Sequence, residues 1–403
     1  MDSLLLYEIS GLVFSMPVYL SESVAQRIVD RTMAIIGHNV NVMDRRGVII
    51  GTGDNKRLHT VHEGAVQVLT SGQSCDIYED TDNSMSGARI GINRPVRFRG
   101  EIAGVIGISG NPAEVSQFAD LVVMTADLMI ENAAVMSENH WSMRQRENII
   151  SEMIHGEAER DSLFSIRTRQ FGINPNLPRV AILVSIKNSQ NDSLSVDEVE
   201  HIQYLLRKGH PDDLVALICP SESIILHPVS LKEQWHPDQL EGYLEALQSR
   251  LRGLRRIEFK IAVGRYIKGL PGIPLSYQSA QEAFQLGTQL APEKSVYRYA
   301  DFQLDSLMLD LLHSWKGKEL QNHIQPLLDT DIKGTLRKTL RVFIDAQAHP
   351  GLTAEKLHIH RNTLAYRLEQ IQILTRRNPK DFSDLLLLHF ALRMHELKEY
   401  QRL

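Results

Sequence analysis

One stretch near the C-terminus, residues 352–371, constrains the fold of this chain more than any other, because its pattern predicts two helices joined by a tight turn. We expect Thr353 to cap the first helix, since a threonine hydroxyl accepts a backbone N–H that the first turn leaves without a partner. Apolar residues then recur at helical spacing in the second helix: Leu364, Leu368 and Ile371. The stretch predicts a helix-turn-helix over residues 353–373, within an all-α C-terminal domain of residues 302–403.

The polar face of the second helix is where we expect contacts with DNA. In a helix-turn-helix the second helix lies in the major groove, its first residues reach base edges, and flanking cations hold phosphates. Six residues are predicted to bind double-stranded DNA: His360, Arg361, Asn362, Thr363, Tyr366 and Arg367. The alternative from spacing alone is an ordinary amphipathic helix pair with a solvated polar face, since His358 stands in the turn where a glycine is common.

Charge is distributed unevenly along the chain. From Lys333 to the C-terminus there are 13 lysine and arginine residues against 7 acidic ones, whereas the whole chain has a net charge of −5. A basic end on an acidic body is typical of a DNA-binding domain attached to a sensor.

Length and cysteine use set further bounds. A chain of 403 residues exceeds what one hydrophobic core normally serves, so several domains are expected. Its two cysteines, Cys75 and Cys219, form no metal-binding or disulfide pattern, which favours a reducing cytoplasm. No apolar run is long enough to cross a membrane. Residues 1–20 lack the basic start and the cleavage site of a signal peptide, so we interpret them as an unplaced lead, with Met16 as an alternative start.

Residues 21–137 predict a small α/β sensor of the PAS or GAF kind, in which helices alternate with two hairpins. Residues 102–109, nearly all small or β-branched, predict a buried central strand. A long helix from Ala113 to about Ser137 is expected to end the module. Its rich apolar pattern fits either dimerisation or packing within one chain, so a homodimer is among the expected assemblies.

The middle of the chain predicts a helical linker and a second α/β unit. The linker covers residues 138–178 and includes a separate helix at 147–156, and the α/β unit covers residues 179–301. The turn Ser221-Glu222-Ser223 is a poor match to the paired carboxylates that bind metal in nucleotide cyclases, and no Gly-Gly-Asp/Glu-Glu-Phe run occurs. We therefore interpret this unit as a structural or transmission element and expect no enzyme activity.

The richest polar cluster of the first module, residues 53–64, follows a strand and leads into a helix. Its arginine can bind a carboxylate with two hydrogen bonds, while the start of the helix supplies N–H donors. Five residues are predicted to bind a small polyhydroxylated diacid: Asp54, Arg57, His62, Asn93 and Arg94. The alternative is a merely solvated charged loop. His59, His62 and Glu63 lack the spacing and the third ligand of a zinc site, so no metal or cofactor is expected.

Residues 360–368 read His-Arg-Asn-Thr-Leu-Ala-Tyr-Arg-Leu, which resembles the ungapped HRNTLxYRL signature of the PucR-type helix-turn-helix. That motif closes the carbohydrate diacid regulators of bacteria. Residues 41–54 and 104–112 are similar to the sugar-diacid-recognition domain of the same family. The chain departs from the family at Leu58-His59, where isoleucine and glycine are common, and this departure bears on the identity of the effector.

The resemblance extends over nearly the whole chain from about Ser21 and implies a multidomain α/β plus α protein. It implies a sensor, a degenerate cyclase-like domain and a helix-turn-helix, in a cytoplasmic regulator that usually activates genes for the uptake and breakdown of carbohydrate diacids. The implied effectors are glucarate, galactarate or glycerate. The alternatives are a regulator of the same architecture that senses another metabolite, a signalling enzyme built on the central unit, and an adaptor that acts through protein contacts.

Overall fold

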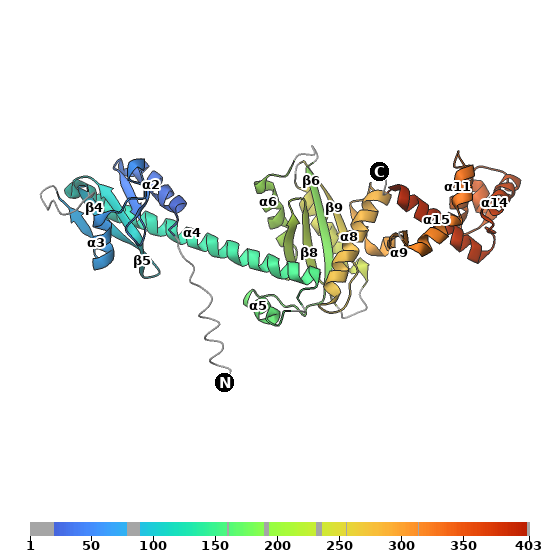
Figure 1. The fold of residues 1–403 in the computed structure, drawn as a ribbon, viewed down its shortest axis with the longest axis horizontal. Coiled ribbons are helices and arrows are strands. Elements are labelled where there is room, and N and C mark those ends of the chain that lie inside the picture. The colour runs from blue at the N-terminus through green and yellow to red at the C-terminus, as the bar shows by residue number, and fades with distance from the viewer. Residues whose placement is uncertain are drawn as a thin grey trace, which may run out of the picture. The chain divides into compact units, whose positions relative to one another are not determined.

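The computed structural model describes residues 20–78, 89–158, 161–188, 193–230, 236–254, 256–312 and 314–400 (Figure 1). They fall into two compact units that divide between Arg144 and Gln145. The lead predicted over residues 1–20 lies, apart from Leu20, outside the described residues, and so does Met16. None of the helices in the described ranges combines the length and hydropathy that a membrane span requires.

The first unit is built on a five-stranded antiparallel sheet in the order β2-β1-β5-β4-β3. β5 is its central strand, as the small and β-branched residues predict. The elements of this unit are α2 (Glu22–Ile36), β1 (Val40–Met43), β2 (Ile49–Thr52), the 3-10 helix η1 (Asn55–Arg57), α3 (Glu63–Ser71), β3 (Cys75–Ile77), β4 (Gly91–Phe98), β5 (Glu101–Ser109) and α4 (Pro112–His155), whose residues after Arg144 belong to the second unit.

Side chains alternate between the two faces of this sheet, and each face is covered by helices. The face that carries Val42, Ile106 and Ile108 packs against α2 and the first half of α4. The opposite face packs against α3 around Met43 and Val105. Because both faces are covered, polar side chains near the middle of the inner strands, such as Asn41 and Asn93, are buried.

Two tight turns fix the register of the hairpins. Gly47 closes the β1–β2 hairpin with a φ of 77°, a backbone conformation that glycine adopts readily. Arg99 and Gly100 join β4 to β5 with φ values of 49° and 87°. Two successive positive φ values suit the right-handed twist of a two-residue hairpin.

α4 is a single helix of 44 residues, and this corrects the expectation of one helix ending near Ser137 and another beginning at Glu147. The polar residues between them suggested a break, but residues 138–155 contain neither glycine nor proline, so nothing interrupts the backbone hydrogen bonds. The helix gives way at Gly156, which adopts a φ of 75°.

The second unit begins with a sheet in the order β10-β9-β6-β8-β7, antiparallel except for the pair β9–β10. Helices α6 and α7 cover one face and α8 the other. The elements are α5 (Phe164–Gln170), β6 (Arg179–Asn188), α6 (Val196–Arg207), β7 (Leu214–Cys219), β8 (Glu222–Pro228), η2 (Pro237–Leu240), α7 (Glu241–Arg252), β9 (Ile257–Val263), α8 (Gly272–Leu290), β10 (Val296–Arg298) and η3 (Tyr299–Phe302).

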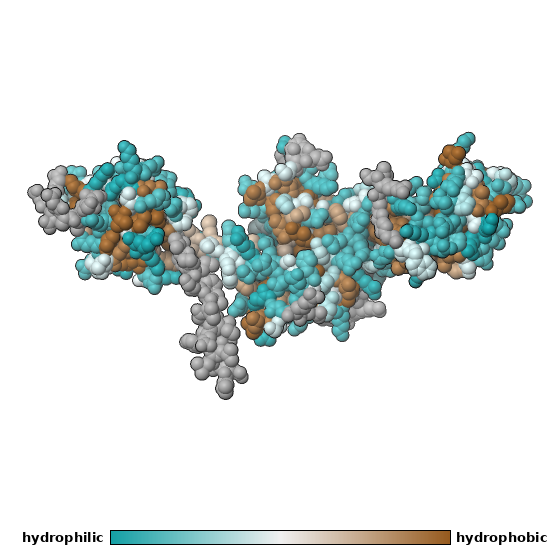
Figure 2. All heavy atoms as spheres, viewed as in Figure 1, coloured by the Kyte–Doolittle hydropathy of each residue, from teal (hydrophilic) through white to brown (hydrophobic). Residues whose placement is uncertain are grey.

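The remainder of the second unit is helical. Its elements are α9 (Gln303–Leu312), α10 (Trp315–Asn322), α11 (Gln325–Thr330), α12 (Thr335–Asp345), α13 (Pro350–Lys356), α14 (Arg361–Thr375) and α15 (Phe382–Tyr400). α11 to α15 share one hydrophobic core, in which Phe343, Leu364, Leu368, Ile371 and Leu388 are buried. On the visible face of these helices, hydrophilic residues predominate among scattered hydrophobic ones (Figure 2).

The first helix of the expected helix-turn-helix begins earlier than predicted. α13 starts at Pro350, and His349 is its cap, since its Nδ1 accepts the N–H of Leu352 at 3.2 Å. Thr353 is buried inside the helix, where its hydroxyl donates to the carbonyl of His349 at 2.8 Å. Proline at the first helical position has a pre-set φ and no N–H to satisfy, so it begins this helix more readily than Thr353.

Candidate DNA-binding and effector sites

α13 and α14 meet at a tight turn that positions the polar face of α14. His358 adopts a left-handed φ of 53° in this turn, the conformation for which glycine is usually chosen. The N–H of Ile359 donates to the carbonyl of Ala354 at 3.0 Å, and the Ile359 side chain packs on the core shared by α11 to α15. Ala354 is buried beside it. The turn therefore forms without a glycine.

The outer face of α14 carries most of the residues predicted to touch DNA. Arg361, Asn362, Thr363 and Tyr366 are exposed, and Tyr366 is 61% exposed despite its aromatic ring. The face borders a hollow of about 500 Å³ between α14 and the loop that leads to α15. Residues that line it are Asn362, Ala365, Tyr366, Leu368, Glu369, Gln372, Asn378, Pro379 and Lys380.

Gln372, Asn378 and Lys380 were not singled out from the sequence. Glu369 lies one turn beyond Tyr366 on the polar face, and Gln372 lies about one turn beyond Glu369, so the same helical period would have found it. The two loop residues carry no such signal, because they reach this face through the turn after α14 and not through periodicity.

Two of the six predicted residues are placed differently from the others. His360 caps α14, and its Nδ1 accepts the N–H of Asn362 at 3.3 Å. Arg367 is half-buried and donates from Nη1 to the hydroxyl of Thr339, in α12, at 3.3 Å. Arg367 therefore links α14 to α12. The sequence had predicted instead that it flanks the exposed face of α14.

In the first unit, a row of polar residues crosses the sheet on the face covered by α3. Thr52, Asn41, Gly107 and Asn93 lie directly opposite one another on β2, β1, β5 and β4. Residues directly opposite in neighbouring strands point to the same face. Thr52, Asn41 and Asn93 are no more than 2% exposed. We call these three side chains the polar row; Asn41 and Thr52 were not predicted, although alternation within Val40–Met43 places Asn41 on a buried face.

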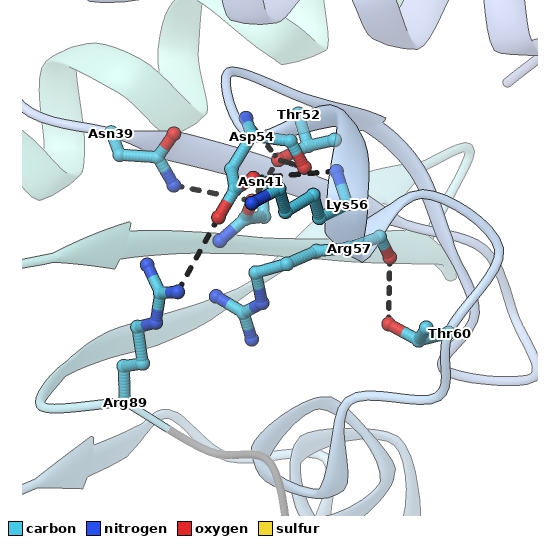
Figure 3. Close-up of polar contacts among 8 residues, drawn as sticks. All are labelled: Asn39, Asn41, Thr52, Asp54, Lys56, Arg57, Thr60 and Arg89. Atoms are coloured by element: carbon cyan, nitrogen blue, oxygen red, sulfur yellow. Dashed lines mark hydrogen bonds and ion pairs between the residues drawn. The ribbon is translucent and has the colours of Figure 1, made fainter.

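Hydrogen bonds join the polar row to the loop that contains η1 (Figure 3). Thr52 Oγ1 donates to Asn41 Oδ1 at 2.6 Å and accepts the N–H of Asp54 at 3.0 Å. Asp54 caps η1, and its Oδ2 lies 3.3 Å from Nη2 of Arg89. Burial and the positive charge of Arg89 lower the pKa of Arg57, while the negative charge of Asp54 raises it.

His62 and Asn93 lie beside the N-terminus of α3. His62 is 4% exposed and caps α3, with its Nδ1 accepting the N–H of Ala65 at 3.3 Å. Burial, followed by the positive charge of Arg57, lowers the pKa of His62 to about 4, so the ring is neutral at pH 7. A Cβ added at Gly64 would lie 2.8 Å from Nδ2 of Asn93 and 3.1 Å from Cε1 of His62, so both side chains border this glycine.

Arg94 does not join the other predicted ligand residues, and this corrects the expectation from the sequence. It follows Asn93 on β4 and lies directly opposite Ile106, so its side chain belongs to the opposite face of the sheet. There its guanidinium pairs with the carboxylate of Asp76 on β3. The structure thus brings Asp54, Arg57, His62 and Asn93 to one region and separates Arg94 from it.

His59 and His62 do not converge, although they are three residues apart. His59 is exposed, with a φ of 63°, and its Nδ1 lies 3.8 Å from a carboxylate oxygen of Glu22. His62 is buried beneath α3. Within the described ranges, no three histidine, cysteine, aspartate or glutamate side chains are arranged to hold a metal ion.

Three family models match the chain. Residues 20–153 match a model described as sugar diacid recognition, residues 155–286 a GGDEF-like domain, and residues 336–394 a PucR C-terminal helix-turn-helix domain. The matches cover, in turn, the unit that carries the polar row, the sheet of β6 to β9 and the α13–α14 pair. A GGDEF-like match by itself shows no catalysis.

Several relatives resemble the chain along nearly its full length. The carbohydrate diacid regulator of Escherichia coli (strain K12) is 36% identical over 383 residues, which cover 94% of this chain and 98% of the relative. An uncharacterized protein of Haemophilus influenzae is 34% identical over 370 residues, which cover 88% of this chain and 94% of that protein. A solved regulator of polyketide synthase expression from Bifidobacterium adolescentis aligns at 16% identity with a TM-score of 0.30, over 63% of this chain and 93% of that chain, which is too distant to bear on the fold.

Proposed function

This chain belongs to the family of carbohydrate diacid regulators, and on that premise we propose that it activates genes for the uptake and breakdown of carbohydrate diacids in response to such an acid. The coarser part of this statement, a transcription regulator with a PucR-type helix-turn-helix, follows from the family. The observation that carries DNA recognition is the exposed outer face of α14, with Asn362 and Tyr366 at helical spacing. Asparagine can read adenine with two hydrogen bonds in the major groove.

The effector site proposed for the first unit lies over the polar row, between η1, Arg89 and the N-terminus of α3. Arg57 suits a carboxylate, because a guanidinium donates two parallel hydrogen bonds to it. Asp54 orients Arg89 through their 3.3 Å contact. His62 is a neutral donor here: its Nδ1 accepts the N–H of Ala65, which leaves the proton on Nε2. Glucarate, galactarate and glycerate are the candidate effectors.

We divide the chain functionally into a PAS- or GAF-type sensor of residues 21–137, a helical linker of residues 138–178, a transmission domain of residues 179–301 and a DNA-binding domain of residues 302–403. Effector binding would shift the population of two states that differ in operator affinity. The free energy available for this shift is limited by the difference in effector affinity between the two states.

A second copy of the chain is the partner proposed for α4. Leu121, Met124, Leu128 and Val135 are each 45% to 55% exposed, and they recur at intervals of three, four and seven residues. This spacing forms a coiled-coil seam, on the side of α4 opposite the buried Val122, Ala126 and Ile130. A helix with the same spacing fits such a seam, and another copy supplies it. Two copies would also present two helix-turn-helix motifs to the half-sites of an operator.

The effector proposal is tested by the melting temperature of the purified protein with glucarate, galactarate and glycerate, and with gluconate as an acid that has one carboxylate in place of the two of glucarate. A ligand that binds only the folded state raises the melting temperature in a concentration-dependent way. We expect a saturable rise with one of the candidates and a smaller one with gluconate. Arg57→Ala should abolish the rise.

The matched control is Arg45→Ala, an exposed arginine in the β1–β2 turn that pairs with Glu101. It removes the same charge from the same unit and should leave the response intact. If no candidate changes the melting temperature, the effector assignment is wrong, while DNA binding by α14 is untouched. Equal loss in both variants would mean that the charge of the unit, and not a site at Arg57, controls binding.

A further inference from the structure

We propose that the sensor recognises the hydroxyl group next to an effector carboxylate, by holding that single oxygen between Asn41 and Asn93. The inference rests on the effector site proposed above and specifies its ligand as a 2-hydroxycarboxylate. It depends on which hydrogen-bonding groups of the polar row are already used within the chain.

The acceptor of Asn41 is used. Its Oδ1 accepts from Thr52 Oγ1 at 2.6 Å and from Asn39 Nδ2 at 3.3 Å (Figure 3). With both bonds made to Oδ1, the amide oxygen of Asn41 faces Thr52 and Asn39. The Nδ2 group, with two N–H donors, has no hydrogen bond among the described residues. Asn41 therefore offers a donor.

The acceptor of Asn93 is not used. Asn93 is 2% exposed, its Nδ2 reaches the carbonyl of Cys75 only at 3.5 Å, and its Oδ1 is buried with no hydrogen-bond partner among the described residues. Buried acceptors without a partner are uncommon in proteins, because burial removes the hydrogen bonds that water would supply. Asn93 therefore offers an acceptor that the protein leaves unsatisfied.

The two asparagines stand on either side of Gly107 in the central strand. Strands are spaced by about 4.8 Å, so the backbones of β1 and β4 lie roughly 10 Å apart across β5. Asn93 Oδ1 projects over this gap, since it would lie only 2.9 Å from a Cβ at Gly107, and Met43 Cε would lie 3.4 Å from the same point. A single oxygen atom between Asn41 and Asn93 can bridge the two side chains with two hydrogen bonds of about 2.8 Å each.

A hydroxyl group matches what the two asparagines offer. Its oxygen accepts from Asn41 Nδ2 while its proton goes to Asn93 Oδ1, whereas a carboxylate has no proton to give and a methylene makes neither bond. The side chains of Arg57 and Arg89 extend toward the space beside Asn41 in Figure 3, and the charges of the two arginines interact. A carboxylate held there places its neighbouring carbon, and the hydroxyl on it, next to Asn41.

The test compares tartrate with succinate on the full chain by titration calorimetry. Both probes are four-carbon diacids, and only tartrate has hydroxyls beside its carboxylates. We expect tartrate to bind at least about tenfold more tightly, since a buried polar group without a partner is left behind when the hydroxyl is missing. Lactate and 3-hydroxypropionate are isomers that differ only in the position of the hydroxyl. Lactate, whose hydroxyl is next to the carboxylate, should bind more tightly than 3-hydroxypropionate.

Asn93→Leu is the decisive variant, with Asn93→Val as a smaller alternative if leucine does not fit. Either one removes an unsatisfied acceptor, so the melting temperature without ligand should stay equal or rise, and tartrate should fall to the affinity of succinate. Equal affinity of tartrate and succinate for the wild type would overturn the inference and leave the diacid site standing. Binding of neither probe would overturn both. A lower melting temperature of both variants without ligand would mean that Asn93 Oδ1 serves the protein itself, which also overturns the inference.

Discussion

At the scale of single residues, His62 ties the stability of the first unit to pH. Its pKa is about 4 in the folded chain, mainly because it is buried, against about 6.5 for an exposed histidine. Between these values the unfolded chain binds a proton that the folded chain does not. The free energy of unfolding therefore falls as the pH drops from 6.5 toward 4, and this contribution is fully present above pH 6.5.

His62→Asn should reduce that dependence. Asparagine also caps helices, so the variant retains a side chain that accepts an N–H of α3. We expect the wild type to lose up to about 2 kcal/mol of stability between pH 7 and pH 5 through this group, and the variant to lose correspondingly less. Thermal unfolding of the two proteins across this range measures the difference. Parallel curves for the two proteins would show that His62 titrates normally.

Arg361 and Arg367 are both in the signature, but the structure gives them different surroundings. Arg361 is exposed at the start of α14, whereas Arg367 donates to Thr339. Arg361→Ala should lower the slope of log binding constant against log salt concentration by about one, because one phosphate contact is lost. Arg367→Ala should leave that slope unchanged and lower stability by about 1 kcal/mol. Binding measured from 50 to 200 mM salt separates the two, and a reduced slope for Arg367→Ala would mean that it leaves Thr339 to reach a phosphate.

The sequence identified residues of the effector region where a loop concentrates charge, and it missed residues where the signal lies in pairing. Asp54, Arg57 and His62 stand within ten residues of one another, so they were visible as a cluster. Asn41 belongs with Asn93 only because β5 pairs with both β1 and β4, and pairing between distant strands is not encoded in any local pattern. Arg94 was misplaced for a different reason: side chains alternate along a strand, so Arg94 and its neighbour Asn93 lie on opposite faces of the sheet. The roles of these residues remain predictions.

At the scale of helices and strands, α4 makes the clearest prediction. Leu128→Glu puts a charge into the middle of its exposed seam and should convert a dimer to a monomer, because burying an unpaired carboxylate opposes association. Analytical ultracentrifugation of the full chain measures the change. Operator affinity should fall with it, since two half-sites would no longer be bound together.

Ser116→Glu is the matched control for this variant. It adds a glutamate to another exposed position of the same helix, away from the seam of Leu121, Met124, Leu128 and Val135. This variant should keep the oligomeric state of the wild type. A wild type that is monomeric at micromolar concentration, or a dimer that survives Leu128→Glu, would contradict the role assigned to α4.

Long periodic elements were predictable, and their ends and the shortest strands were not. β5 and α14 have strong patterns, and both were expected. β3 and β10 have three residues each and are strands only through pairing with the strands beside them, so no local sequence pattern predicts them. α4 is longer than predicted because polar residues alone do not end a helix, and residues 138–155 contain no glycine or proline. α13 begins before Thr353 because Pro350 opens the helix and His349, which accepts the N–H of Leu352, caps it; a histidine cap is a weaker signal in a sequence than a threonine.

At the scale of the whole molecule, DNA binding and effector binding should be separable. Asn362→Ala should abolish preference for the operator and leave the rise in melting temperature with effector unchanged. Arg57→Ala should do the reverse, keeping operator binding and losing its dependence on the effector. Fluorescence anisotropy with operator and scrambled DNA, alongside the melting assay, tests both variants. Loss of both properties in either variant would argue against two distinct sites.

The general architecture was predicted more fully than the function of its parts. The mixed α/β chain with a GGDEF-like middle and a PucR-type helix-turn-helix at the end is confirmed by the family matches. These features have long signatures or repeated patterns within one segment. The PAS or GAF nature of the first unit remains a prediction. The order of its strands could not be obtained from local patterns, because strands such as β1 and β5 pair although they are far apart in the sequence.

Cys75 has a practical consequence for the protein as a whole. It lies opposite Asn93 on β3, at the end of the polar row, and Cys219 is the other cysteine of the chain. Replacing Cys219 by serine would leave one thiol beside the proposed effector site, to which an environment-sensitive fluorophore could be attached. Burial and the charge of Asp76 raise the pKa of this thiol, so labelling would need mildly alkaline conditions. The chain then becomes a biosensor whose emission reports the acid it binds, with no operator or transcription in the assay.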